Sequence, residues 1–158
     1  MQGLERDEGR PEGHDEERAA RDEREVPGLR NGAVSDPKVV ALSSRQVALT
    51  IARTALDAKA EDLVILDLRR LSSSFDFFVL CSAASARRIQ TVAEGVEERL
   101  TTDRIKLRHR EGRPEGGWVL LDYGGVIGHI FSSEARSFYR LERLWADAPH
   151  VPIPRRSP

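Results

Sequence analysis

The stretch WVLLDYGGVIGHIF, residues Trp118–Phe131, decides the fold of this 158-residue chain. Two apolar runs rich in β-branched and aromatic residues, Trp118–Tyr123 and Val126–Phe131, are separated by Gly124 and Gly125. Because adjacent glycines can take the positive φ values of a tight turn, this pattern predicts a β-hairpin. Neither run keeps a continuous polar face, so we expect other elements to cover both sides of the hairpin.

Three side chains with polar groups interrupt the hairpin: Asp122, Tyr123 and His129. We expect them at the turn or on the second strand, where the sheet meets solvent or a partner. A histidine on a strand could act as a general base, but no serine or cysteine nucleophile is tied to His129 by the sequence. The alternative is a histidine that is hydrogen-bonded at the sheet surface or buried at an interface.

The composition is that of a soluble protein, with 32% charged residues and a net charge of -1. This balance favours neither a membrane nor a sequence-specific nucleic-acid partner. No run reaches the roughly 18 apolar residues of a membrane span, and the charged N-terminus is unlike a signal peptide, so we expect a cytoplasmic protein. The single cysteine, Cys81, excludes an internal disulfide and follows an apolar run that predicts a buried thiol.

The chain divides into three regions by composition. Residues 1–41 are rich in charge and contain no aromatic side chain. Such a segment cannot bury enough surface to offset an ordering cost of about 1 to 2 kcal/mol per residue, so we predict a disordered extension. Residues 42–150 are predicted to form one folded domain. Residues 151–158 hold three prolines and are predicted to form a mobile tail.

Within the domain, apolar residues at spacings of three and four predict a helix capped by Ser43 or Ser44. Strands are predicted over 63–68 and 75–82. Ser85 then caps a second predicted helix, which is followed by a basic edge strand over 105–110. After the hairpin, one last helix begins at Ser132 or Ser133. Its apolar side chains are Ala135, Phe138, Tyr139, Leu141, Leu144 and Trp145.

This order of elements predicts an α/β fold: a single domain with one mixed sheet of about five strands and flanking helices. The aromatic residues of the hairpin and the last helix dominate its second half, since no aromatic occurs before residue 75. Most of them must be core. Tyrosine and tryptophan also anchor protein interfaces, and a hairpin edge can accept a partner strand.

Asp76 provides the one enzyme-like feature. The run SSSFDFF, residues 72–78, is similar to the serine loop and paired carboxylates of nucleotidyltransferases. Those enzymes need two carboxylates to bridge Mg²⁺ ions about 3.5 to 4 Å apart. Here the second position is Phe78, which cannot ligate a hard cation. We therefore expect no enzyme, no metal and no cofactor; a nucleotidyltransferase-like enzyme that uses Asp76 is the alternative.

Five segments carry a family resemblance. They are AEDLVILD (60–67), FDFFVL (75–80), WVLLDYG (118–124), HIF (129–131) and YRLERLW (139–145). In this order, and over about residues 43–150, they closely resemble the ribosomal silencing factor family, RsfS, also called Iojap. The resemblance implies a domain related in shape to nucleotidyltransferases but without their activity.

The same resemblance implies a function and a partner. Members bind the large ribosomal subunit on its fourteenth protein, at the face that meets the small subunit, and slow translation when nutrients run short. Some form homodimers. Two departures from the family pattern stand out: Ala83-Ala84 replaces the usual Gly-Thr before Ser85, and Gly125 replaces an aspartate near the expected contact surface.

We therefore expect a docking surface on the hairpin and the helix that follows it. A bound copy of this size would block subunit joining sterically, without catalysis. The same surface could instead be the seam of a homodimer. The expected contacts or their immediate supports are Asp76, Trp118, Asp122, Tyr123, His129, Tyr139 and Trp145.

Overall fold

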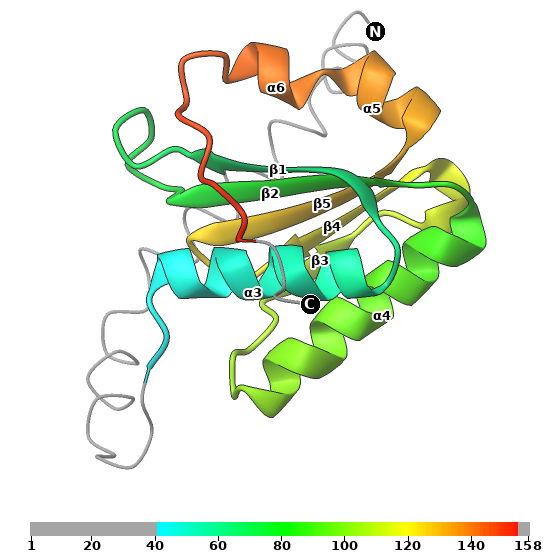
Figure 1. Ribbon diagram of the computed structural model, residues 1–158, viewed down its shortest axis with the longest axis horizontal. Coiled ribbons are helices and arrows are strands. Elements are labelled where there is room, and N and C mark those ends of the chain that lie inside the picture. Colours follow the sequence, from blue (N-terminus) through cyan, green and yellow to red (C-terminus); the bar gives the residue numbers. More distant parts are fainter. Residues whose placement is uncertain (1–40, 155–158) are drawn as a thin grey trace, which may run out of the picture. The chain divides into compact units, whose positions relative to one another are not determined.

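Five strands form one mixed sheet, in the order β1-β2-β5-β4-β3, in the computed structural model of this protein (Figure 1). The structure describes residues 41–154. Nearly all of the segment predicted to be disordered, and residues 155–158, lie outside the described residues. The expected α/β domain with a five-stranded mixed sheet is confirmed.

The elements follow the predicted order along the chain. They are α3 (Ser44–Asp57), β1 (Glu61–Asp67), β2 (Phe77–Ala83), α4 (Ala86–Thr102), β3 (His109–Glu111), the 3₁₀-helix η2 (Pro114–Gly116), β4 (Trp118–Asp122), β5 (Val126–Ser132), α5 (Ser133–Tyr139) and α6 (Leu141–Leu144).

Side-chain caps explain where the two long helices begin. The Ser43 hydroxyl accepts the Gln46 N–H at 3.1 Å, and the Gln46 side chain accepts the Ser43 N–H at 2.8 Å. This reciprocal capping box fixes the start of α3. The Ser85 hydroxyl accepts the Arg88 N–H and caps α4 in the same way. The Ala83-Ala84 departure therefore leaves the cap in place.

The predicted hairpin is formed by β4 and β5. The Tyr123 N–H donates to the Val126 carbonyl at 2.9 Å and closes the turn. Gly124 has φ +95°, whereas Gly125 does not take a positive φ. The turn therefore requires only the first of the two glycines to be in the left-handed region.

Helices cover both faces of the sheet (Figure 1). On one face, α3 and α4 pack their apolar stripes against the strands, and the predicted stripe of α4 is fully buried. The short helices α5 and α6 lie on the opposite face (Figure 1). Cys81 is buried on the side of α3 and α4, as expected from its apolar neighbours. No helix among residues 41–154 is long and apolar enough to cross a membrane.

Some predicted strand bounds were wrong. β1 begins at Glu61, because a bulge between Glu61 and Val64 lets charged residues join the edge of the sheet. β2 begins two residues later than predicted. The edge strand pairs only over β3, and Ile105 packs against the core without a strand partner.

The end of the domain also differs from the sequence prediction. The single last helix is two helices, because Arg140 takes the left-handed conformation with φ +50°. Val151, which was placed in the mobile tail, is buried and donates its N–H to the Ile65 carbonyl at 2.8 Å. His150 forms a β-bridge with Leu66. Residues 150–151 therefore cover part of the β1 edge.

Candidate functional site

Four ring side chains lie on the sheet face beneath α5 and α6, and we call them the aromatic layer: Phe78, Trp118, His129 and Phe131. The pairing of β4 with β5 sets Trp118 opposite Phe131, and Leu120 opposite His129, on this face. The Trp118 ring lies 5.1 Å from that of Phe131 and 4.5 Å from that of Tyr139, measured between centroids. The strand alternation thus joins the hairpin to α5 through ring contacts.

His129 lies at the centre of this layer. Its ring is 4.7 Å from that of Phe78, and Phe78 in turn contacts Trp145 at 5.9 Å. The Trp118 Nε1–H donates to His129 Nδ1 at 3.2 Å. His129 Nε2 is buried without a hydrogen-bond partner. Burial, and to a smaller extent the positive charge of Arg136, lower the pKa of His129 to about 3.

Above the layer, α5 and α6 expose large apolar side chains. Phe138 is 78% exposed, Leu144 is 69% exposed and Tyr139 is 37% exposed. We call these three residues the α5–α6 surface. The Tyr139 ring contacts both Phe138 and Trp118, so part of this surface rests directly on the aromatic layer. Exposed apolar side chains gathered on one short segment are typical of an interaction site.

A bidentate ion pair joins the two short helices across their break. Arg136 of α5 donates Nε–H and an Nη2 hydrogen to the carboxylate of Glu142 of α6, at 3.0 and 2.8 Å. Arg136 also donates to the Ser82 hydroxyl of β2 at 2.9 Å. The hydrogen bonds from Arg136 hold the pKa of Glu142 below its usual value. Since the pair bridges α5, α6 and the sheet, it fixes the position of the α5–α6 surface.

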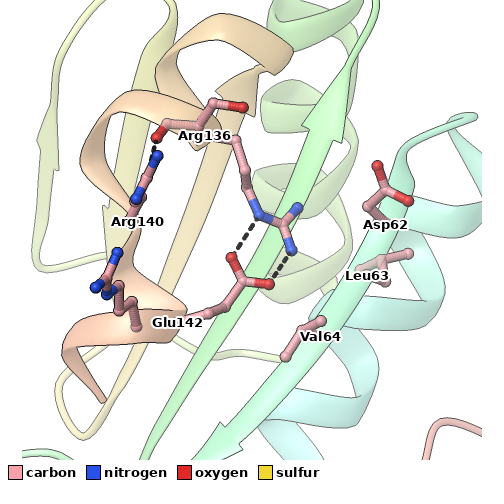
Figure 2. A pocket seen from close by; sticks show the side chains of 8 residues that line it. Asp62, Leu63, Val64, Arg136, Arg140 and Glu142 are labelled. Atoms are coloured by element: carbon pink, nitrogen blue, oxygen red, sulfur yellow. Dashed lines mark hydrogen bonds and ion pairs between the residues drawn. The ribbon is translucent and has the colours of Figure 1, made fainter. Parts of the chain in front are cut away.

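An open groove of about 640 Å³ lies between β1 and these helices (Figure 2). Asp62, Leu63 and Val64 form one wall, and Arg136 and Glu142 are joined in its middle (Figure 2). Arg140 and Arg143 also line it. Among residues 41–154, no group of three or more histidine, cysteine or acidic side chains is placed to hold a metal ion.

The structure brings together four of the seven residues expected at the site. Trp118, His129, Tyr139 and Trp145 all belong to or contact the aromatic layer. Tyr139 is exposed, Trp118 and Trp145 are half-buried, and His129 is only 1% exposed. The expectation that His129 meets solvent was therefore wrong, and the alternative of a buried histidine agrees with the structure. Its role as a support beneath the surface stays a prediction.

Asp122 and Tyr123 are also buried, contrary to that expectation. Asp122 accepts the Gly124 N–H at 2.8 Å, so its carboxylate serves the hairpin turn. Tyr123 packs into the core shared with α3 and α4, on the other face of the sheet. Burial raises the pKa of Tyr123, and the nearby Glu97 carboxylate adds to the increase. Tyr123 is therefore a core residue.

Asp76 lies just before β2 and away from the strand position that the sequence suggested. Its carboxylate accepts the Ser44 hydroxyl of α3 at 2.6 Å, and its N–H donates to the Gly125 carbonyl at 2.7 Å. It links the start of α3 to the hairpin turn. Phe78, at the position of a second carboxylate, is buried in the aromatic layer.

Sequence reasoning did not identify Phe138 and Leu144 as exposed, because it could not divide the apolar residues of the last helix into core and contact residues. A signal was present in the pattern. At about 100° per residue, the six apolar residues from Ala135 to Trp145 cover more than half of a helix circumference. A helix lying on a sheet cannot bury so wide an arc, so some of these residues had to face outward.

Comparison with known proteins gives the family. The family model described as "Ribosomal silencing factor during starvation" matches residues 41–158. The chain belongs to the ribosomal silencing factor family. The family's name indicates a regulatory factor that acts on ribosomes rather than an enzyme. The match begins where the described part of the chain begins.

Relatives from bacteria and plants are similar to this family member. It is 39% identical to the ribosomal silencing factor RsfS of Bacillus subtilis over 102 residues, which are 64% of this chain and 86% of the relative. It is 30% identical to the chloroplastic protein Iojap of Zea mays over 127 residues, which are 78% of this chain and 55% of the relative.

Solved structures share the fold. A crystal structure of a protein from Chromobacterium violaceum is 25% identical, with a TM-score of 0.64 over 73% of this chain and 92% of that one. A crystal structure of a protein from Bacillus halodurans is 30% identical, with a TM-score of 0.61 over 69% of this chain and 99% of that one.

Proposed function

We propose that this protein binds the large ribosomal subunit through the α5–α6 surface, blocks joining to the small subunit and so represses translation under nutrient limitation in the cytoplasm. The observation that carries the proposal is the exposure of Phe138, Tyr139 and Leu144 above a buried aromatic layer. Exposed apolar side chains on a rigid base can anchor a protein interface with little ordering cost.

The partner within the subunit is proposed to be its fourteenth protein, as the resemblance to the family implies. Tyr139, Trp118 and Trp145 are the predicted residues that remain accessible enough to touch it. His129 supports Trp118 from below, since it is buried and accepts the Trp118 N–H, whereas the buried Asp122 serves the hairpin turn. Tyr123 has no part in this contact, because its side chain lies on the opposite face of the sheet.

Silencing by this route requires only size and occupancy. A domain of about 110 residues has a radius of gyration of about 13 Å, so it stands roughly 30 Å off the surface that it covers. Subunits join through contacts of a few ångströms. At a free concentration of about 100 times Kd, the unbound, joining-competent large subunit is disfavoured by about 2.7 kcal/mol, or a hundredfold.

Two alternative functions, homodimer formation and nucleotidyl transfer, predict different experimental results. If the α5–α6 surface joins two copies of the chain, the mass measured in solution doubles, and Leu144→Ser should give a monomer. If Asp76 supports nucleotidyl transfer, a purified sample turns over nucleotide with Mg²⁺, and Asp76→Asn abolishes turnover. The hydrogen bond from Ser44 to Asp76 favours a structural role, in which Asp76→Asn leaves ribosome binding unchanged.

The proposal is tested by a matched pair of leucines. Leu144 is 69% exposed on α6, and Leu56 is 45% exposed on α3, on the other side of the sheet. We expect Leu144→Ser to weaken binding to purified large subunits by about tenfold or more, because burying a leucine is worth roughly 1.5 to 3 kcal/mol. Leu56→Ser should bind as the parent protein does.

Co-sedimentation with purified large subunits over a range of protein concentrations measures both affinities. Circular dichroism of each variant shows whether the fold is kept. Equal affinities for the two folded variants would refute docking through the α5–α6 surface. Absence of any binding by the parent protein would refute the proposed function itself.

A further inference from the structure

Two arginines beside the α5–α6 surface carry charge that the described part of the chain does not neutralise. Arg140 and Arg143 line the groove, and between residues 41 and 154 neither makes an ion pair with a carboxylate. Arg136, by contrast, is neutralised by Glu142 (Figure 2). Asp62 is the remaining carboxylate of the groove, so two arginines face one acid.

The backbone of Arg140 strengthens the case that its side chain is used. Arg140 follows α5 with φ +50°, the left-handed position after a helix that glycine fills most readily. Among the described residues 41–154, its side chain donates one hydrogen bond, to the Ser137 carbonyl at an exposed site. Glycine here would relieve backbone strain, and nothing within the domain requires the guanidinium.

We propose that Arg140 and Arg143 contact the phosphate backbone of ribosomal RNA next to the protein on which the α5–α6 surface docks. This inference rests on the proposed function. A cation at the rim of a docking site on a ribosomal protein lies close to RNA, the other component of the subunit. Guanidinium groups bind phosphate oxygens in pairs and hold their charge at every physiological pH.

The chemistry indicates backbone contact rather than base recognition. Both arginines are exposed, and the groove that they line is open to solvent. The net charge of the chain is -1 and does not favour a general attraction to RNA, so the proposed contact depends on the local charge of these two residues. Contacts of this kind position a protein and add salt dependence without adding sequence specificity.

Salt dependence provides the measurement. Each phosphate contact adds about 0.7 to 0.9 to the slope of log affinity against log salt concentration. Two contacts therefore weaken binding by about tenfold between 50 and 200 mM salt. Binding of the full chain to purified large subunits is measured over this range for the parent protein and for Arg140→Gly/Arg143→Gln. We expect the variant to lose a slope of about 1.5.

A control variant at another arginine shows whether the position of Arg140, rather than the loss of a charge or of backbone strain, determines the effect on binding. Arg104 is also exposed and has a positive φ, +63°, but it follows the C-cap of α4, a helix on the other face of the sheet. Arg104→Gly removes the same charge and the same backbone strain as Arg140→Gly. Both should melt at or above the temperature of the parent protein. Only Arg140→Gly should weaken binding to large subunits and lower the salt slope.

Binding to the isolated fourteenth protein, without RNA, distinguishes the two sources of negative charge. We expect Arg140→Gly/Arg143→Gln to bind it with the affinity of the parent protein. Equal losses on the isolated protein and on the subunit would overturn the RNA contact in favour of an acidic protein surface. Unchanged salt slopes on the subunit would overturn it while leaving the proposed function standing. Only failure of the parent protein to bind subunits would refute the function itself.

Discussion

His129 should make the stability of this domain sensitive to mild acid. In the folded state the ring is buried, accepts a hydrogen bond from Trp118, and has a pKa lowered to about 3 by burial and by Arg136. In the unfolded chain the pKa returns to about 6.5. The unfolded state therefore binds a proton below about pH 6.5 that the folded state refuses until about pH 3. Acid consequently favours unfolding.

The size of the effect follows from the two pKa values. The contribution of His129 to the free energy of unfolding falls by about 2.5 kcal/mol between pH 6 and pH 4, since each pH unit between the two pKa values is worth about 1.4 kcal/mol. Hydrogen bonds from arginines lower the pKa values of Asp67 and Glu142, so these two carboxylates also contribute less to the free energy of unfolding in acid. A comparison with a His129 variant cancels their contribution.

His129→Gln is the appropriate variant, because the side-chain carbonyl of glutamine can accept the Trp118 N–H and the amide does not titrate. Urea unfolding at pH 6 and pH 4 gives the free energy of unfolding of both proteins. We expect the acid-induced loss to be about 2.5 kcal/mol smaller in the variant, even if the variant is less stable at pH 6. Equal losses in both proteins would show that His129 is not held neutral in the folded state.

Three further predictions concern the fold. Gly112 has φ +85°, and a Cβ there would lie 2.1 Å from the Trp118 carbonyl oxygen, so Gly112→Ala should destabilise the domain by roughly 3 kcal/mol in urea unfolding. Ser43→Ala removes the capping box of α3 and should cost about 1 kcal/mol in the same assay. Burial raises the pKa of Cys81 to about 12, so a thiol reagent at pH 8 should label Cys81 no faster than the domain opens. Rapid labelling of the folded protein, or unchanged stability of either variant, would contradict these assignments.

The parts of the fold that could be predicted have local signals in the sequence. Ser43 and Ser85 mark helix starts because a hydroxyl there can accept an N–H that the helix leaves unpaired. The apolar stripe of α4 follows a period of 3.6, and the two apolar runs of the hairpin are set apart by the glycines between them. Each of these signals depends only on neighbouring residues, and the structure confirms each one.

The parts that could not be predicted depend on long-range contacts. The break at Arg140 carries no glycine or proline, and the Arg136–Glu142 pair that bridges it joins residues six positions apart. Polar residues of the hairpin were expected at the surface, yet the buried Asp122 carboxylate accepts a hydrogen bond from its own turn, and the buried His129 Nδ1 accepts one from Trp118. Such pairings are invisible to periodicity. The sequence indicated the exposure of Phe138 and Leu144 only through the wide arc that the apolar residues from Ala135 to Trp145 would cover on a single helix.

Subunit joining tests the central claim most directly. Purified large and small subunits are mixed with increasing amounts of the full chain, and free subunits and joined ribosomes are separated by sedimentation. We predict that the protein sediments with the large subunit and that joined ribosomes decrease in proportion to the bound protein. Joined ribosomes that form in undiminished amount while carrying the protein, or large subunits that never bind it, would contradict the account.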